Sequence, residues 1–194
     1  ERYAKGSAWG DYDNDGWLDL LVSNMEGPAR LYHNQGDGTF IDVAPELGVV
    51  GPPHGFTCMF WDYNDDGRLD IFIADYSSNL AEVVASFLGL PVRSDEHAHL
   101  YRNLPTGGFR ESSREAGLAR PMPCMSVNAA DIDNDGDLDL YLGTGWMSLS
   151  GLIPDLMYVN NGGRFEDVTE STGTGHLQKG HGVSFADWDD DGDL

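Results

Sequence analysis

Hydrophobic residues in this chain come in short runs bounded by polar and glycine-rich segments. The runs at 20–23, 71–74 and 140–143 are rich in β-branched and large apolar residues, and each is too short for a globular helix. They predict strands, and the same order of runs returns several times along the chain. We therefore expect an all-β protein built from a repeated unit.

A second recurring pattern follows each of these runs and predicts a β-hairpin. It consists of Leu-Tyr-x-Asn (Met-Tyr-x-Asn in the third copy), a glycine-rich turn and a phenylalanine, and it occurs at 31–43, 100–111 and 157–168. Two strands that flank a glycine-rich turn are typical of a hairpin. One unit thus holds four strands, as a blade of a β-propeller does.

An acidic loop of one repeated pattern joins the first two strands of each unit. The pattern Asp-x-[Asp/Asn]-x-Asp-Gly-x-Leu-Asp occupies 11–19, 62–70 and 131–139, and a fourth copy at 187–194 stops one residue short. Oxygens at positions 1, 3, 5 and 9, with the backbone carbonyl of position 7, would surround a cation of the size of Ca²⁺. Glycine at position 6 permits the sharp turn. Four copies argue against a chance acidic turn.

These loops predict three complete Ca²⁺ sites and a fourth that is truncated at the chain end. Mg²⁺ suits them less, because it demands octahedral geometry and keeps its waters. An EF-hand is excluded, because strands flank the loops and position 12 is Val22, Ile73 or Leu142 instead of Glu. The expected ligands are Asp11, Asp13, Asp15, Trp17 and Asp19; Asp62, Asn64, Asp66, Arg68 and Asp70; Asp131, Asp133, Asp135, Asp137 and Asp139; and Asp187, Asp189, Asp191 and Asp193.

The spacing of the motifs shows where the units differ in length. From the first Asp of each loop to the Tyr of the next hairpin there are 21, 39 and 27 residues, whereas from that Tyr to the next loop there are 30, 30 and 29. The variable connection therefore lies between the second and third strands. Successive connections of an antiparallel blade alternate between its ends, so we expect the acidic loops on one face and the variable connections on the other.

The longest variable connection, residues 77–99, contains a predicted helix. Asn79 followed by Glu82 resembles a capping box, and Gly89 and Pro91 supply a stop. We expect its apolar stripe to pack on the sheets, with binding of a partner as the alternative. The stripe consists of Leu80, Val83, Val84, Phe87 and Leu88.

Charge and composition exclude several classes of function. The 194 residues include 33 acidic and 11 basic side chains, a formal net charge of −22, with no cluster of Lys and Arg that would neutralise phosphates. Binding of nucleic acid or of an anionic membrane is therefore excluded. No apolar run approaches the ~20 residues of a membrane span. Cys58 and Cys124 both enter first strands, and we expect two buried thiols, with a bridge between adjacent blades as the alternative.

The acidic loops, the hairpin motif and the segment Gly-His-Gly-Val-Ser-Phe-Ala-Asp at 180–187 resemble the FG-GAP/VCBS-repeat β-propellers, and among them the cartilage acidic protein group. Members of that group often carry an ASPIC/UnbV domain after the propeller. The resemblance implies a calcium-stabilised propeller, secreted or attached to the cell surface, used in adhesion and in protein or glycan contact, with no shared catalytic residue. Asn64 departs from the commonest pattern and removes one charge.

The number of repeats predicts an incomplete ring. The loops are spaced by about 59 residues on average, so the chain holds a little over three blades, whereas closed propellers have ~4–8. We expect a segment of a larger, seven-bladed ring. Its remaining blades would come from the same longer chain or from a neighbouring segment.

The functional prediction is a non-catalytic module for binding, adhesion or assembly outside the cell, with a protein or glycan ligand on the face without calcium. The alternative is a propeller enzyme, a polysaccharide lyase or hydrolase, with its site on that same face; a lectin is a third possibility. Five histidines fall in segments of that face: His54, His97, His99, His176 and His181. We expect them to bond to backbone, with a transition-metal or acid/base site as the alternative, and His97 and His99 alternate like a metal pair.

Overall fold

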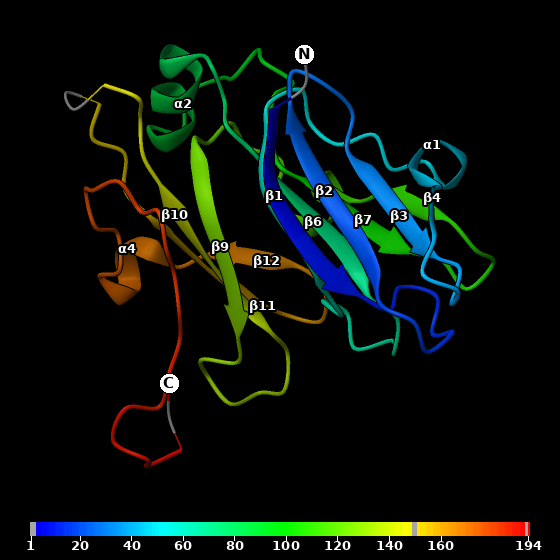
Figure 1. Cartoon of the computed structure of the whole chain (residues 1–194). Coiled ribbons are helices and arrows are strands. Elements are labelled where there is room, and N and C mark those ends of the chain that lie inside the picture. Colours follow the sequence, from blue (N-terminus) through cyan, green and yellow to red (C-terminus); the bar gives the residue numbers. More distant parts are fainter. Residues whose placement is uncertain (1–2, 149–150, 193) are drawn as a thin grey trace.

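The protein is an all-β assembly of three four-stranded antiparallel sheets (Figure 1). It is described by a computed structural model that covers residues 3–148, 151–192 and 194. The strands of each sheet follow chain order, and this confirms the predicted blade. The sheets contain β1 (Tyr3–Gly10), β2 (Asp19–Met25), β3 (Arg30–Asn34) and β4 (Phe40–Asp42); β5 (Gly55–Trp61), β6 (Asp70–Asp75), β7 (His99–Asn103) and β8 (Phe109–Glu111); and β9 (Cys124–Ala130), β10 (Asp139–Thr144), β11 (Leu156–Asn160) and β12 (Phe165–Asp167).

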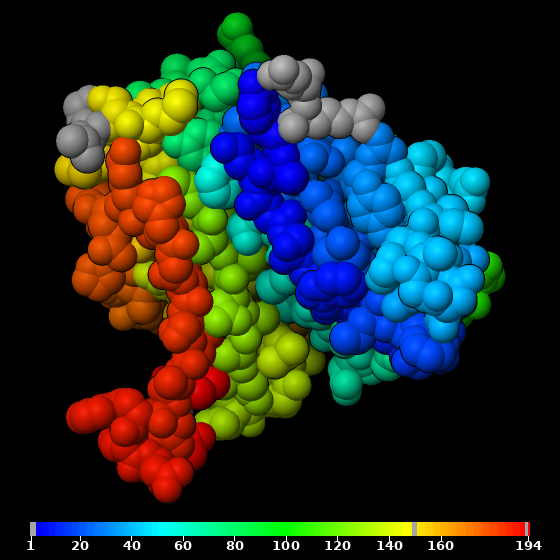
Figure 2. Space-filling view, in the orientation of Figure 1, coloured from blue at the N-terminus to red at the C-terminus, as the bar shows by residue number. Residues whose placement is uncertain are grey.

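The three sheets are arranged as neighbouring propeller blades. β1 lies beside β5, and β5 lies beside β9, so that the first strands come together while the fourth strands lie outermost (Figure 1). In the space-filling view β1 runs along the surface, and the segment at the C-terminal end stands away from the sheets (Figure 2). Among the described residues, no helix has the length and apolar character that a membrane span requires.

Three short helices were missed by the sequence analysis. α1 (Ala44–Leu47), α3 (Ser113–Ala116) and α4 (Thr169–Thr172) each follow the fourth strand of a blade. A helix of four residues is too short to show an apolar period. Each is followed by a glycine in the left-handed conformation, Gly48, Gly117 or Gly173, which ends the helix and turns the chain toward the next blade.

The strand β6 explains how the blades hold together. Ile71 and Ile73 pack into the core between the first two sheets, whereas Phe72 and Ala74 pack into the core between the second and third. Successive residues of a strand point to opposite faces, and both faces of β6 are covered, so that every residue of β6 is buried. The central blade therefore contributes to two cores.

The asparagine of the hairpin motif connects each blade to the one before it. The side-chain amide of Asn103 donates to the carbonyls of Tyr12, at 2.7 Å, and of Leu69, at 3.0 Å. Asn160 repeats this in the third blade, with Tyr63 as the acceptor at 2.8 Å in the preceding loop. In the second and third blades the motif asparagine thus joins its own loop to the acidic loop of the preceding blade.

The insertion forms the predicted helix, but two details differ from the prediction. α2 (Leu80–Phe87) is capped by the Asn79 side chain, which accepts from the backbone amides of residues 81 and 82. Glu82 does not close a capping box, because its carboxylate accepts instead from the backbone amides of Arg93 and Ser94. Val83 is fully buried, whereas Val84 and Leu88 are exposed, so only part of the apolar stripe packs on the sheets.

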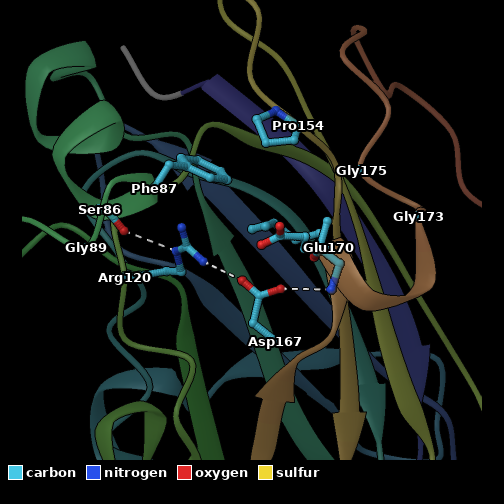
Figure 3. Close-up of a pocket in the computed structure, with 11 residues that line it drawn as sticks. Ser86, Phe87, Gly89, Arg120, Pro154, Asp167, Glu170, Gly173 and Gly175 are labelled. Atoms are coloured by element: carbon cyan, nitrogen blue, oxygen red, sulfur yellow. Dashed lines mark hydrogen bonds and ion pairs between the residues drawn. The ribbon is translucent and has the colours of Figure 1, made fainter.

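Arg120 fixes α2 to the third blade (Figure 3). Its guanidinium donates to the Ser86 hydroxyl at 3.1 Å and to the Asp167 carboxylate at 2.7 Å. The same group lies over the ring of Phe87, 4.4 Å from its centre, in a cation–π contact. These contacts line a hollow of about 630 Å³ between α2 and α4.

Two further expectations concern the cysteines and the segment near the C-terminus. Cys58 and Cys124 are both buried free thiols, which confirms the expected state. Residues 181–186, expected to be the first strand of a fourth blade, form no strand.

We expect Asn160→Ala to lower the free energy of unfolding by about 2–3 kcal/mol, because the carbonyls of Tyr63 and Leu138 lose their donor. The measurement is denaturant unfolding followed by circular dichroism. Asn34→Ala is the matched control, since the Asn34 side chain bonds to Leu18 and Gly36 of its own blade and is partly exposed. An equal loss in the two variants would contradict the connection between blades.

We expect Arg120→Ala to lower the free energy of unfolding by about 1–2 kcal/mol, because α2 loses a hydrogen bond, an ion pair and a cation–π contact. Arg114→Ala is the control: Arg114 and its partner Asp95 are both exposed, and such pairs contribute less than ~1 kcal/mol. Indistinguishable unfolding of the two variants would show that Arg120 does not hold α2.

Candidate metal-binding loops

The acidic loops all lie at one end of the blades. They connect β1 to β2, β5 to β6 and β9 to β10, and they lie at the lower end in Figure 1, whereas α2 lies at the opposite, upper end. The connections between second and third strands, which vary in length, share the end that carries α2. The predicted division into an acidic face and a decorated face is confirmed.

One carboxylate organises the backbone of every loop. Asp11 accepts from the amides of Asp15 at 3.0 Å and Gly16 at 2.9 Å, and Asp62, Asp131 and Asp187 do the same in their loops. Position 4 has positive φ in all four loops, and the glycine at position 6 has φ between 80° and 98°, a region that glycine enters without steric cost. All four loops therefore share one conformation.

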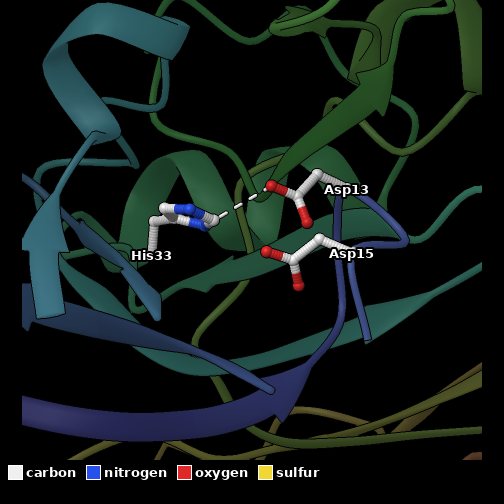
Figure 4. A group of neighbouring side chains, drawn as sticks. All are labelled: Asp13, Asp15 and His33. Atoms are coloured by element: carbon white, nitrogen blue, oxygen red, sulfur yellow. Dashed lines mark ion pairs between the residues drawn. The ribbon is translucent and has the colours of Figure 1, made fainter. Parts of the chain in front are cut away.

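Carboxylate oxygens converge inside three of the loops. In each set the oxygens lie within 4.8 Å of one another, and such close like charges repel unless a cation lies between them. Asp15 forms a further group with Asp13 and His33 (Figure 4). The three converging sets are Asp11, Asp13 and Asp19; Asp131, Asp133 and Asp139; and Asp187, Asp189 and Asp191.

Burial and crowding disfavour the charged form of several of these acids. Burial raises the pKa of Asp13, and the neighbouring Asp15 and Asp19 raise it further. Burial also raises the pKa of Asp139 and brings the pKa of Asp70 to about 7. The pKa of Asp187 is lowered instead, chiefly by the hydrogen bond from the amide of Gly192.

The aspartate at position 9 has a structural role that the sequence analysis missed. Asp139 is fully buried, and it accepts from the amide of Ile132 at 2.8 Å and from the amide of Asn160 at 2.7 Å. Asp19 and Asp70 make the equivalent bonds. The same carboxylate thus fixes the start of the loop to the end of the third strand, whether or not it also binds an ion.

The residue before the motif asparagine differs between the blades, so that each acidic loop has a neighbour of different charge. In the first blade His33 lies 3.4 Å from Asp13 and 3.2 Å from Asp19. In the second blade Arg102 lies 3.4 Å from Asp66, which also pairs with Arg68 at 2.6 Å. In the third blade the position is Val159, which is uncharged. These side chains from the third strand were not predicted as part of the sites.

The second loop differs from the others in the contacts of its acidic and amide side chains. Asp66 is paired with the guanidinium groups of Arg68 and Arg102. Among the described residues, the acids of the second loop form no set of three converging ligands like those of the other loops. The Asn64 side chain, at position 3, has both its oxygen and its nitrogen buried without a hydrogen-bond partner. Because a buried amide oxygen is normally bonded, this oxygen fits a cation ligand.

The remaining predicted ligands are only partly described. Trp17, Arg68 and Asp137 donate their backbone amides to the carboxylates of Asp15, Asp66 and Asp135; that their carbonyls bind an ion stays a prediction. Asp193 lies outside the described residues.

His97 and His99 are not arranged as the suggested metal pair. His97 Nδ1 lies 2.7 Å from the carbonyl of Asp95, and His99 Nδ1 lies 2.9 Å from the hydroxyl of Tyr101. Burial lowers the pKa of His99 to about 4. Among the described residues, neither histidine belongs to a set of three ligating groups. His97 therefore bonds to backbone as expected, whereas His99 bonds to a side-chain hydroxyl.

Comparison with known proteins identifies the repeat. A model of the FG-GAP-like repeat family matches residues 11–73 and 62–142, a span that holds the first three acidic loops. Cartilage acidic protein 1 of Homo sapiens is 33% identical over 127 residues, which cover 63% of this chain and 16% of that protein. The Xenopus tropicalis protein of that name is 31% identical over 141 residues, which cover 71% of this chain and 19% of that protein. The chain thus matches less than a fifth of the length of these relatives.

Solved structures with a related arrangement include two rhamnogalacturonan lyases. The Bacillus licheniformis enzyme has a TM-score of 0.47 at 13% identity, over 89% of this chain and 35% of that one. The lyase YesW has a TM-score of 0.43 at 14% identity, over the same shares. The family match spans more than half of the chain and coincides with the repeated loops and blades. The chain belongs to the FG-GAP-like repeat family.

Proposed function

We propose that this chain is a calcium-stabilised propeller segment that acts outside the cell as a non-catalytic module for binding or assembly. The observation that carries the proposal is the convergence of carboxylate oxygens at the same place in the first, third and fourth loops. A hard cation with six to eight oxygen ligands suits such a set, and the free amide oxygen of Asn64 suits it in the second loop.

Calcium would act on stability through the loops. Each loop sits between two strands of a blade, so an ion bound only in the folded state stabilises that blade. At extracellular calcium of ~1 mM, a site with a Kd of ~10⁻⁴ M contributes about 1.4 kcal/mol. Three such ions would also reduce the formal charge of −22 by six units, which weakens the repulsion within the folded chain.

An extracellular location agrees with the acidity and with the relatives. The relatives are named for cartilage and for their acidity, and this chain is strongly acidic as well. Loops whose sites are weak need the high calcium concentration found outside cells. The location follows from the calcium proposal and is tested along with it.

The decorated face is the proposed ligand surface. It carries α2, whose Val84 and Leu88 are exposed. It also carries the partly exposed Trp146, which stacks on the buried Tyr76 with ring centres 6.4 Å apart. Aromatic faces next to polar loops bind sugars or peptide side chains. Binding of a protein or glycan here without turnover supports the proposal, whereas cleavage of a polysaccharide by the chain would overturn its non-catalytic part.

Removal of calcium with EDTA is expected to lower the melting temperature by about 10 °C, because three sites together contribute about 4 kcal/mol in a chain of this size. Differential scanning calorimetry with Ca²⁺, with Mg²⁺ and with EDTA measures this, and Mg²⁺ should restore less. Asp133→Asn should lose part of the calcium-dependent gain, whereas Glu46→Gln, an exposed acid outside the loops, should keep it. A melt that EDTA leaves unchanged contradicts the proposal.

The second loop is expected to bind calcium most weakly and the third most strongly. Arg68 and Arg102 compete with an ion for Asp66, whereas the third loop has five aspartates. Arg102→Gln should raise the affinity of the weakest site about fivefold, because a nearby unit charge is worth ~1 kcal/mol in solvent-exposed surroundings.

Calorimetric titration with Ca²⁺ measures this change in affinity. Arg110→Gln is the charge-matched control, because its partner is the exposed Glu115. If Arg102→Gln leaves the weakest site unchanged or weakens it, the ranking of the loops is wrong.

A further inference from the structure

A second cluster of ligating side chains lies at the opposite end of the central blade from its acidic loop. His54 precedes β5, Asp75 ends β6 and Glu96 precedes β7. Each offers one ligand atom, and the three atoms lie within 4.8 Å of one another. None of the three belongs to the acidic loops. For His54 the sequence predicted a bond to backbone, with a transition-metal or acid/base site as the alternative.

The groups in this cluster lack the partners that buried polar groups normally have. Asp75 is 0% exposed, and neither of its carboxylate oxygens has a hydrogen-bond partner. His54 Nδ1 is also buried without a partner. More than nine in ten buried polar groups in proteins are bonded, so three unbonded atoms at one point call for a missing partner.

The charges in the cluster are not compensated. Burial, together with the nearby Glu96 carboxylate, raises the pKa of Asp75 to about 7. Among the described residues, no Lys or Arg forms an ion pair with either acid. A buried carboxylate without a cation costs several kcal/mol, and a bound cation removes that cost.

Hydrogen bonds from Ser77 and Ser78 hold the Glu96 carboxylate in position. Its carboxylate accepts from the Ser77 hydroxyl at 2.9 Å, from the Ser78 amide at 3.1 Å and from the Ser78 hydroxyl at 3.2 Å. Bonds of this kind orient a metal ligand. His54 and Asp75 are fixed by the backbone, because Gly55 pairs with Asp75 and the carbonyl of His54 accepts from the amide of Tyr76 at 2.9 Å.

The other two blades show that the carboxylate is specific to this place. The residues equivalent to Asp75 at the end of the second strand are Asn24 and Thr144. Asn24 donates to the carbonyl of Pro28 at 2.8 Å, and Thr144 donates to the carbonyl of Pro154 at 2.9 Å. The side chains of Asn24 and Thr144 thus both form a hydrogen bond to the connection that follows their strand. Only the blade with the long insertion has a carboxylate here, and the insertion supplies Glu96.

We propose that His54, Asp75 and Glu96 bind one divalent transition-metal ion, with Zn²⁺ or Mn²⁺ as the ion to test. One imidazole nitrogen and two carboxylates form a mixed donor set that suits first-row transition ions, whereas Ca²⁺ prefers oxygen alone. Water completes the coordination. The ion would fasten the end of the 77–99 insertion to the first and second strands of the central blade, and this inference does not depend on calcium in the acidic loops.

The test is calorimetric titration of the full chain with Zn²⁺ and, separately, with Mn²⁺, both in excess Ca²⁺ so that the loops are saturated. The wild-type chain is expected to bind one equivalent. Asp75→Asn and His54→Ala are expected to weaken that binding at least tenfold. His181→Ala, which removes an exposed imidazole, and Asp133→Asn, in the third loop, are expected to leave it unchanged.

Asp75→Asn keeps the experiment decisive even if His54→Ala fails to fold. The substitution preserves the shape of the side chain and removes a buried charge, so without transition metal the variant should melt at or above the temperature of the wild type. Added Zn²⁺ should raise the melting temperature of the wild type and not that of the variant. If the wild type binds neither ion, or if Asp75→Asn binds as tightly as the wild type, the proposal is wrong.

Discussion

The architecture depends on one buried carboxylate in each blade, the aspartate that ends the acidic loop. It accepts from the amide at the start of the loop and from the amide of the motif asparagine, as Asp139 does from Ile132 and Asn160. The loop, the second strand and the third strand are therefore fixed at one point, and burial of that point excludes water. A repeat needs this aspartate for its backbone as well as for any ion.

The repeated parts of the fold were predictable from sequence. The motifs recur in the same order although one connection varies in length. They predicted the strand order, the hairpins, the position of the acidic loops and the separation of two faces, and the structure confirms all four. The cap of α2 by Asn79 was also predictable. These features depend on local chemistry, which a single sequence displays.

The features that were missed depend on contacts between distant segments. Arg102 lies at Asp66 only because the third strand pairs back onto the second, and the cluster at Asp75 forms only because β5, β6 and the end of the insertion meet. Glu82 binds the backbone of residues 93 and 94 instead of its own helix end, because the insertion folds back on itself. The spacing of residues along the chain does not predict contacts between such distant segments.

The asparagine links have a consequence for how the loops behave together. Tyr12 donates its amide to Asp19 and accepts from Asn103, Asn103 donates its amide to Asp70, and the same sequence of bonds continues through Tyr63 and Asn160 to Asp139. A network of hydrogen bonds, connected through the backbone of these residues, thus runs from the first loop to the third. Because each loop is bonded to the next through these groups, displacement of one loop strains the bonds of its neighbour, and the three loops are expected to loosen together instead of one blade at a time.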